Sequence, residues 1–310
     1  MFGVAIQEAD APAAVQRIAE AERACVEAAW ANMGGAGGVD MLPVFAVAAT
    51  RTERIKLGTA IIHTWSRHPL VLAQESAAIE QLAPGRLRLG IGPTSAVLAK
   101  RFYGLEYRKP LTNLREYLIT VRALLHEGTV EFQGEHVTAR SRLSVTAPVP
   151  VLASALRPRS FELCGELSDG AISWMCPLSY LLDVALPAMR RGAEKAGRET
   201  PPLVAHVPIA MTADREAARA LARTQLATYA SGQNFRGMFA AAGFDVTEGY
   251  SDQLLDDLVV SGDESEVAEA LANWHQAGVG EVLAHPLFEP DDREPALKSA
   301  YAAIARAAGA

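Results

Sequence analysis

The sequence has 310 residues, half of them hydrophobic and 21% charged, a balance typical of a globular protein. Its formal net charge is −7, with 36 acidic against 29 basic side chains, which argues against nucleic acid as the main partner because phosphate binding requires an excess of Lys and Arg. No run reaches the roughly 18 apolar residues of a membrane span, the N-terminus lacks the basic segment of a signal peptide, and the three cysteines lie far apart. We therefore expect a cytoplasmic protein without a disulfide framework or a metal site.

Short apolar runs, each followed by a helical pattern, repeat along the whole chain. The runs predict eight buried strands, near residues 2, 29, 57, 87, 151, 171, 204 and 282. The helical patterns are expected at about 12–27, 39–52, 69–82, 111–126, 158–166, 187–196, 215–229, 265–276 and 296–308. Eight such βα units in a chain of this length predict a (β/α)8 TIM barrel. A doubly wound open sheet shows the same alternation and is the alternative.

The chain contains no Pro/Gly/Ser-rich linker that would divide it. We therefore predict a single domain over residues 1–310, with insertions near 128–147 and 231–262. The first insertion is expected to contain a hairpin around Gln133-Gly134, and the second is irregular with short helices.

The segment GRLRLGIGPTS, Gly85–Ser95, ends the fourth predicted strand in a GxG. It is not a dinucleotide fingerprint, because Ser95 stands at the third glycine position, and it is not a Walker A loop. Gly90 and Gly92 indicate that the backbone passes close either to a packed element or to a ligand above the strand end. Because the active sites of barrels lie at that end, we favour a ligand.

Two arginines follow the fifth predicted strand. The run RPRS, Arg157–Ser160, opens the next helix, and Pro158 is typical of a first helical position. A helix N-terminus offers free N–H groups and partial positive charge, so with two guanidinium groups and a hydroxyl it predicts a phosphate or carboxylate site. Solvated arginines at an ordinary strand–helix corner are the alternative.

The segment HTWSRHP, His63–Pro69, follows the third predicted strand at the same barrel end. Histidine titrates near neutrality, so His63 is able to polarise a substrate or hydrogen-bond a cofactor carbonyl. His68 precedes a proline and is expected to begin a helix. No metal-ligand spacing such as HExxH and no GxSxG elbow is present, so the sequence favours neither a metal site nor hydrolysis.

Trp174 ends the sixth predicted strand and is interpreted either as a core residue or as an apolar wall for a flat ligand. Met33 and Tyr229 have the same two interpretations. Few carboxylates stand at the predicted strand ends. A barrel with an anion site, apolar walls and no acid/base pair is typical of chemistry that a cofactor performs.

Together these segments resemble the bacterial luciferase-like monooxygenase superfamily and, within it, the actinobacterial branch that uses the deazaflavin coenzyme F420. The resemblance covers nearly the whole chain. The matching segments, in order, are IKLGTAI (Ile55–Ile61), RHPLVLAQESAAIEQLAPGRLRLGIG (Arg67–Gly92), REYL (Arg115–Leu118), VEFQGEHVTA (Val130–Ala139), PVPVLASAL (Pro148–Leu156), GELSDGAISWM (Gly165–Met175), SGDESEVAEAL (Ser261–Leu271) and AGVGEVL (Ala277–Leu283).

The resemblance implies that F420, or FMN as the alternative coenzyme, lies across the strand ends. It implies a cis peptide bond between Ala60 and Ile61 under the ring system, with His63 touching the ring. The residues after the GxG that are implied to contact the coenzyme are Gly92, Pro93, Thr94 and Val97. The implied phosphate loop comprises Ala155, Leu156, Arg157, Arg159 and Ser160. The substrate pocket is expected to involve Met33, Trp65, Trp174, Tyr229 and the second insertion.

The sugar-phosphate dehydrogenases of this superfamily carry an Asp-His pair after the second strand and a Glu after the GxG. This chain has Asn32, Met33 and Ser95 at those places. We therefore expect a reductase that moves hydride from reduced coenzyme to an activated C=C, C=N or quinone-like small molecule. The proton is expected to come from water or from His63, which is the predicted catalytic residue. The alternatives are an FMN-dependent monooxygenase and a non-catalytic barrel that binds a phosphorylated ligand. A homodimer is expected because it is common among relatives.

Overall fold

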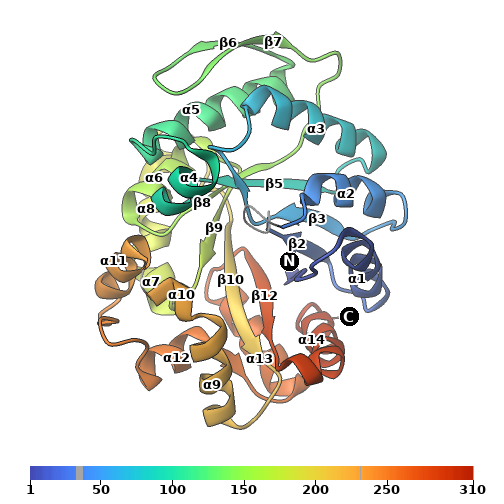
Figure 1. The fold of residues 1–310 in the computed structure, drawn as a ribbon, viewed down its shortest axis with the longest axis vertical. Coiled ribbons are helices and arrows are strands. Elements are labelled where there is room, and N and C mark those ends of the chain that lie inside the picture. The colour runs from blue at the N-terminus through green and yellow to red at the C-terminus, as the bar shows by residue number, and fades with distance from the viewer. Residues whose placement is uncertain (33–37, 231, 310) are drawn as a thin grey trace.

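The computed structural model describes residues 1–32, 38–230 and 232–309. Eight parallel strands close into a barrel (Figure 1): β1 (Phe2–Ala5), β2 (Ala28–Ala31), β3 (Lys56–Thr59), β5 (Leu87–Gly92), β8 (Val151–Ser154), β9 (Gly170–Trp174), β10 (Leu203–Ala210) and β12 (Glu281–Leu287). They follow one another around the barrel in chain order, and the pairing of β12 with β1 closes the ring. The predicted TIM barrel is confirmed, and the open sheet is excluded.

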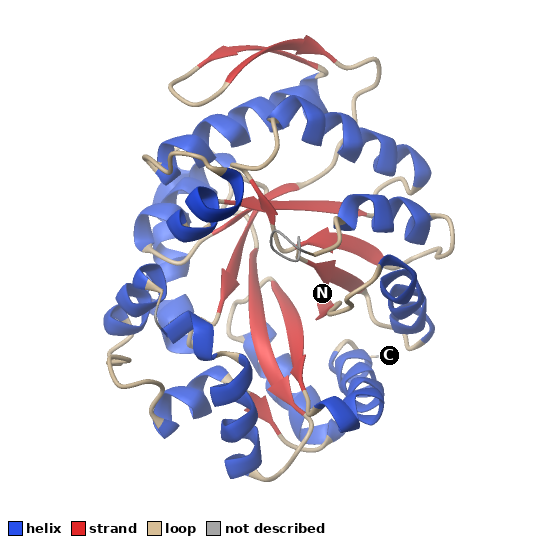
Figure 2. Ribbon diagram, in the orientation of Figure 1, coloured by secondary structure: helices blue, strands red, loops and turns tan. Residues whose placement is uncertain are grey.

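The larger helices surround the strands (Figure 2). The helices are α1 (Ala11–Arg23), α2 (Met41–Ala49), α3 (Pro69–Leu82), α4 (Ala96–Tyr103), α5 (Pro110–Arg122), α6 (Pro158–Leu167), α7 (Leu178–Tyr180), α8 (Leu186–Lys195), α9 (Arg215–Gln225), α10 (Ala227–Ala230), α11 (Gln233–Ala241), α12 (Asp252–Leu258), α13 (Glu264–Gln276) and α14 (Arg293–Ala307). The third predicted strand, near residue 57, is interrupted after Thr59 and continues after a break as the short strand β4 (Ile62–His63). The helix expected over 215–229 is divided into α9 and α10 at Leu226, which leaves helical geometry.

Local sequence explains where several helices begin. Pro69 is the first residue of α3, where its missing N–H costs no hydrogen bond, and the His68 ring accepts a hydrogen bond from the first turn. The Asp214 carboxylate caps α9 in the same way. Asp263 and Glu266 form a reciprocal capping box at the start of α13.

Both segments that were expected as insertions add elements to the βα pattern. β6 (Thr129–Gln133) and β7 (Thr138–Arg142) form an antiparallel hairpin outside α5 (Figure 1). The Glu116 carboxylate of α5 accepts hydrogen bonds of 2.7–2.9 Å from three backbone N–H groups of the hairpin turn, which fixes the hairpin to the barrel. The second segment contains α11, α12 and the short strand β11 (Val260–Ser261), which pairs with β10.

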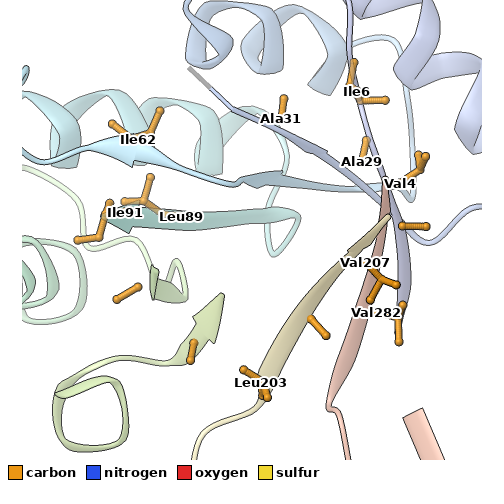
Figure 3. Packing of buried hydrophobic residues seen from close by; sticks show 14 of the residues in the cluster. Val4, Ile6, Ala29, Ala31, Ile62, Leu89, Ile91, Leu203, Val207 and Val282 are labelled. Carbon is orange, nitrogen blue, oxygen red and sulfur yellow. The ribbon is translucent and has the colours of Figure 1, made fainter. Parts of the chain in front are cut away.

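Alternate residues of each strand face the two sides of the barrel wall, as the pleat requires. The outward-facing set, which includes Val4, Ala29, Leu203 and Val282, belongs to the large core between strands and helices (Figure 3). The inward-facing set forms a separate cluster in the lumen: Ala5, Ala28, Trp30, Leu152, Ile172, Val204 and Leu283.

Trp30 fills the lumen and is only 1% exposed. A Cβ on Gly3 would lie 2.8 Å from its indole ring, and one on Gly58 would lie 2.2 Å from it. These two strand positions therefore require glycine because the indole occupies the space of a side chain. The barrel interior is packed at this level, as in other TIM barrels.

Below Trp30, at the amino ends of the strands, Arg88 forms an ion pair with Glu281, and its guanidinium lies 5.5 Å from the Trp30 ring centroid. Burial raises the pKa of Glu281, and the charge of Arg88 opposes that shift. A cavity of about 460 Å³ opens at this end of the barrel. Cys25 is exposed in the loop between α1 and β2, also at this end, whereas Cys164 and Cys176 are buried.

Within the part of the chain that is described, no helix has the length and apolarity needed to cross a membrane.

Candidate active site

Polar and aromatic side chains face the lumen at the carboxyl ends of the strands, one step beyond Trp30. Ile172, Val204 and Leu283 line the lumen, so the residues two positions later on the same strands face the same side. The lumen-facing residues at this level are Gly92, Ser154, Trp174, His206 and His285. The carboxyl ends of barrel strands are where the active sites of TIM barrels lie.

The strand break at residues 60–61 borders this mouth. The peptide bond between Ala60 and Ile61 is cis, as the resemblance implied, and both side chains pack against the lumen cluster. Hydrogen bonds hold the segment at both ends. The Thr59 hydroxyl exchanges two hydrogen bonds of 2.8 Å with the Gly90 backbone, and the Thr64 N–H donates to the Gly92 carbonyl at 3.0 Å.

The two glycines of the GxG pack against protein atoms. A Cβ on Gly90 would lie 1.9 Å from the Thr59 carbonyl oxygen, and one on Gly92 would lie 2.0 Å from the Ser154 hydroxyl. Close packing of neighbouring strands is therefore sufficient to require glycine at both positions. Of the two explanations offered by the sequence, contact with a packed element accounts for Gly90 and Gly92 without a ligand.

Three buried polar atoms at the mouth have no hydrogen-bond partner among the described residues. They are Nδ1 of His63, which lies beside Gly92 in the sheet, the hydroxyl oxygen of Thr94, a residue only 5% exposed, and Nε1 of Trp174. Pro93, which precedes Thr94, is half-buried. Burial lowers the pKa of His63, so its ring is neutral near pH 7. Other buried polar atoms of the structure also lack partners, but the His63 and Thr94 atoms lie at the carboxyl ends of the strands, where they are suited to a polar ligand.

The loop after β8 leads into the N-terminus of α6. Ala155 is buried and Leu156 half-buried, whereas Arg157 and Arg159 are exposed. Arg157 reaches the second insertion, since a Cβ on Gly237 of α11 would lie 1.7 Å from its Nη1 atom. The two arginines thus lie at the start of one helix, as the sequence predicted.

The Ser160 hydroxyl has a different role from the one suggested by the sequence. Its oxygen accepts hydrogen bonds from the N–H groups of Leu156 and Arg157, at 3.2 and 3.1 Å, and it donates to the Arg157 carbonyl at 2.8 Å. It therefore stabilises the turn. The Arg159 N–H takes no part in these bonds, so an anion at this helix would be bound by that amide and the guanidinium groups.

Trp174 forms an aromatic cluster with residues from three other elements. Its ring centroid lies 4.2 Å from that of His206 on β10, 4.9 Å from that of His285 on β12, and 5.5 Å from that of Tyr229 on α10. Tyr229 in turn contacts Phe235 of α11, at 5.1 Å between centroids. The second insertion therefore supplies one wall of this cluster. Burial raises the pKa of Tyr229, so its hydroxyl is protonated near neutral pH.

The sequence analysis did not identify His206 and His285. His206 is the one strongly polar residue of LVAHVPIA, and His285 is the one strongly polar residue of EVLAHPL after Glu281 at its amino end. Strand alternation could have found them, because both lie two residues after a lumen-facing apolar residue. Their contact joins residues 79 positions apart and requires the barrel to be known.

The remaining predicted residues lie outside the Trp174 cluster or are not described. Trp65 packs with Tyr107 and His136, at 5.2 and 5.5 Å between ring centroids, and so belongs to a different aromatic cluster from Trp174. Val97 is on α4 and is 69% exposed. Met33 lies outside the described residues.

The site offers neutral histidines, aromatic walls and arginines. Among residues 1–32, 38–230 and 232–309, no group of three or more His, Cys, Asp and Glu side chains is arranged to hold a metal ion. Ser95, which follows the GxG, caps α4 by accepting a hydrogen bond from the Leu98 N–H at 3.1 Å. These side chains are suited to binding and orienting a flat ligand and to moving protons through neutral imidazoles.

Comparison with known proteins finds relatives whose names refer to coenzyme F420. Over 290 residues it is 27% identical to a Mycobacterium tuberculosis protein whose name gives coenzyme F420-dependent oxidoreductase as a provisional assignment; the match covers 79% of this chain and 82% of that protein. Over 205 residues it is 32% identical to the F420-dependent glucose-6-phosphate dehydrogenase of Nakamurella multipartita, covering 63% and 60% of the two chains.

Solved structures show the same fold over nearly the full length. An F420-dependent secondary alcohol dehydrogenase, solved with an F420-acetone adduct, superposes with a TM-score of 0.81 at 16% identity, covering 99% of this chain and 98% of its own. The oxygenating component of 3,6-diketocamphane monooxygenase from Pseudomonas putida, solved with FMN, has a TM-score of 0.76 at 18% identity, covering 98% and 97%.

The family model described as luciferase-like monooxygenase matches residues 3–281, which span all the barrel strands up to the start of β12. The closed barrel and the polar mouth agree with that match. The chain is therefore an enzyme that belongs to the luciferase-like monooxygenase family.

Proposed function

We propose that this protein is an F420-dependent oxidoreductase, and specifically a reductase that transfers hydride from the reduced deazaflavin to an activated C=C, C=N or quinone-like small molecule. The observation that carries the proposal is the lack of partners at two buried atoms of the mouth, His63 Nδ1 and Thr94 Oγ1. A ligand with a polar edge would restore the hydrogen bonds that these atoms lack. The F420-dependent relatives named above support this coenzyme over FMN.

The residues at the mouth fit a flat, partly polar ring system. Ala60 and Ile61 offer an apolar surface beside the polar atoms of His63 and Thr94. The Trp174 cluster stands on other strands of the same mouth. A ring between these two sides would be shielded from water, which strengthens the hydrogen bonds that orient it.

The start of α6 fits the charged part of the coenzyme. Arg157, Arg159 and the free Arg159 amide are suited to a phosphodiester, because guanidinium groups pair well with phosphate oxygens. Since the Ser160 hydroxyl is engaged in the turn, its contribution is to hold the loop in shape.

When bound and reduced, the coenzyme supplies the hydride. The protein's own side chains then bind the acceptor, exclude water and deliver the proton. Because burial lowers the pKa of His63, this ring acts near neutral pH as a hydrogen-bonding group. According to its tautomer, Nδ1 of His63 would donate to a carbonyl or accept from an N–H on the coenzyme, and the Thr94 hydroxyl is able to donate or to accept.

A titration with two coenzymes tests the proposal. Oxidised F420 and FMN are each added to the purified protein, and binding is followed by absorption and fluorescence. We expect saturable F420 binding that is at least tenfold tighter than FMN binding. Tight binding of FMN without affinity for F420 would contradict the proposal and favour the FMN-dependent monooxygenase.

A double variant tests the assignment of the phosphate site to the start of α6. Arg157→Met/Arg159→Met removes both charges and keeps the aliphatic stems; at Arg157 it also removes the guanidinium that packs against Gly237 of α11. We expect F420 affinity to fall at least tenfold, because charge-assisted hydrogen bonds contribute about 1.5–3 kcal/mol each. Arg140→Met, which removes an exposed arginine of β7, is the matched control. Unchanged affinity in the double variant would contradict the assignment.

A further inference from the structure

His206 and His285 lie side by side on the neighbouring strands β10 and β12. Nε2 of His206 is 3.2 Å from Nδ1 of His285, so one imidazole donates a hydrogen bond to the other. In the ring of eight strands, β10 stands four places from β3, which is directly across the barrel. The pair therefore faces the Ala60–Ile61 segment from the opposite side of the mouth.

Both rings are neutral at physiological pH. Burial and the neighbouring His285 lower the pKa of His206 far below its ordinary value, and burial lowers the pKa of His285 to about 4. Two neutral imidazoles carry two N–H groups between them, and one is used in the contact between the rings. The two outer nitrogens, Nδ1 of His206 and Nε2 of His285, thus consist of one donor and one acceptor in either tautomer.

A purely structural role would not explain why two imidazoles stand at these positions. The layer beneath is apolar, with Ile172, Val204 and Leu283, and apolar residues would continue it at lower cost than two imidazoles that must be desolvated. Both histidines are half-buried residues whose side chains face the lumen. Trp174 stacks on both, and Tyr229 completes the wall on the side of α10. This arrangement presents a flat aromatic face beside one donor and one acceptor.

We propose that the His206–His285 pair binds the oxygen of a flat, conjugated carbonyl substrate, an enone or a quinone, and relays to it the proton that accompanies hydride transfer. The inference deepens the proposed function and rests on it, because it names the substrate class and the proton path of the same site. Trp174 stacks on the conjugated plane of the substrate, while the outer N–H of the pair donates to its oxygen.

The proposed step balances without charge on either ring. Hydride from the reduced deazaflavin forms a C–H bond at the electrophilic carbon, and the displaced π electrons move to the substrate oxygen. That oxygen takes the proton of the outer N–H, and the inner proton crosses the 3.2 Å gap to the ring that lost it. The outer nitrogen of the far ring takes a proton from water, and its vacated inner nitrogen now accepts the hydrogen bond between the rings. The product is an enol or a hydroquinone, and the pair is left in its other tautomer.

The first test observes the rings directly and needs no turnover. Protein labelled with ¹⁵N-histidine is studied by NMR at pH 7.5, with phenol as a flat hydroxyl ligand that cannot be reduced, and His206→Gln and His285→Gln assign the signals. We expect both rings to be neutral and phenol to shift their outer nitrogens, while His275, which packs on Phe2 at the other barrel end, does not respond. A protonated ring at this pH, or no response to phenol, would overturn the proposal.

The second test measures proton transfer during turnover. Reduced F420 is supplied with cyclohex-2-en-1-one or menadione, and rates are measured in mixtures of H2O and D2O. We expect His206→Gln and His285→Gln to lower kcat by about 10²-fold or more, as for loss of general acid catalysis, with F420 affinity within twofold of the wild type. A plot of the wild-type rate against the D2O fraction should be curved, because two protons move together. The same plot for the variants should be linear.

His275→Gln is the matched control and should behave as the wild type in both tests. Wild-type kcat in either active-site variant, or a solvent isotope effect that the variants leave unchanged, would overturn the relay. If the wild type reduces neither acceptor, the proposed function is what fails, and the NMR response to phenol alone then decides whether the pair binds an oxygen ligand.

Discussion

Trp30 determines which residues its neighbouring strands tolerate. The indole occupies the barrel axis, and the Cβ positions of Gly3 and Gly58 coincide with its ring atoms. The surrounding lumen residues are buried, so a methyl group at either glycine would have to displace packed side chains.

Gly58→Ala is therefore expected to destabilise the fold by about 1–3 kcal/mol, the usual range for overpacking a core. Urea unfolding followed by fluorescence measures the change. The double variant Trp30→Phe/Gly58→Ala is the control, since a smaller ring makes room for the methyl group and should recover part of the loss. If Gly58→Ala lowered the free energy of unfolding equally with Trp30 and with Phe at position 30, the indole would not be what requires glycine there.

The lowered pKa of His285 predicts how stability depends on pH. The unfolded chain binds a proton at this histidine near pH 6.5, whereas the folded chain does so only near pH 4. The free energy of unfolding therefore falls as the pH drops from about 6.5 to 4, by up to about 1.4 kcal/mol per pH unit from this group, and the contribution is complete above pH 6.5.

His285→Gln should flatten the stability curve in that window relative to the wild type. Urea midpoints measured at half-unit steps of pH give the comparison, with His275→Gln as the exposed control. Parallel curves for wild type and His285→Gln would contradict the assignment of a neutral, buried ring.

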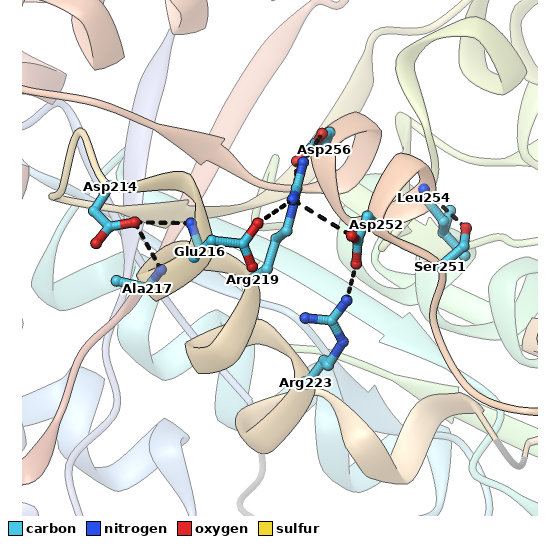
Figure 4. Close-up of polar contacts among 9 residues, drawn as sticks. All are labelled: Asp214, Glu216, Ala217, Arg219, Arg223, Ser251, Asp252, Leu254 and Asp256. Carbon is cyan, nitrogen blue, oxygen red and sulfur yellow. Dashed lines mark hydrogen bonds and ion pairs between the residues drawn. The ribbon is translucent and has the colours of Figure 1, made fainter.

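At the level of elements, an ionic cluster attaches the second insertion to the barrel. The Arg219 guanidinium of α9 binds Asp256 of α12 through two hydrogen bonds of 2.6 and 2.9 Å, and it also contacts Glu216 and Asp252 (Figure 4). Arg223 pairs with Asp252 from the next turn. These contacts help position α12 against α9.

Arg219→Ala should loosen α12. We expect amide hydrogen exchange in α12 to accelerate several-fold, because exposed charge pairs contribute modestly, and the β6–β7 hairpin to remain unchanged. High salt should reproduce part of the effect in the wild type, since the pairs are exposed to screening. Uniform acceleration over the whole chain would indicate a global rather than a local effect.

Sequence periodicity predicted most elements because their patterns are strong and local. All eight barrel strands and helices such as α3, with its proline start, were predicted close to their observed bounds. The helix α4 was not predicted, because Ala99 is its one fully buried residue and no apolar stripe marks it. The break in the third strand was inferred from the resemblance, since nothing in KLGTAII interrupts its β pattern.

At the level of the whole molecule, a coenzyme that binds only the folded barrel should stabilise it. F420 at 100 times its Kd adds about 2.7 kcal/mol to the free energy of unfolding, which raises the melting temperature by several degrees. Differential scanning calorimetry measures this. FMN at the same concentration should have a smaller effect, and Arg157→Met/Arg159→Met should lose most of the shift. Equal shifts with both coenzymes would argue against F420 selectivity.

The site could be predicted from the sequence only where its residues are close in the chain. The loop Arg157–Ser160 and the segment around His63 were predicted as site segments because each is one short run after one strand, and their roles stay predictions. The His206–His285 contact and the cluster on Trp174 depend on the order of strands around the barrel, which no local pattern encodes. The homodimer and the cytoplasmic location stay predictions.

Cys25 is a suitable site for labelling or immobilising this enzyme. It is the exposed cysteine of the three, and it lies at the amino ends of the strands, away from the mouth. Burial raises the pKa of Cys164 to about 12 and also raises that of Cys176, so neither thiol forms the reactive thiolate near neutral pH. A maleimide dye or a thiol-reactive electrode linker should therefore attach at one point and leave every molecule with its mouth facing the solution.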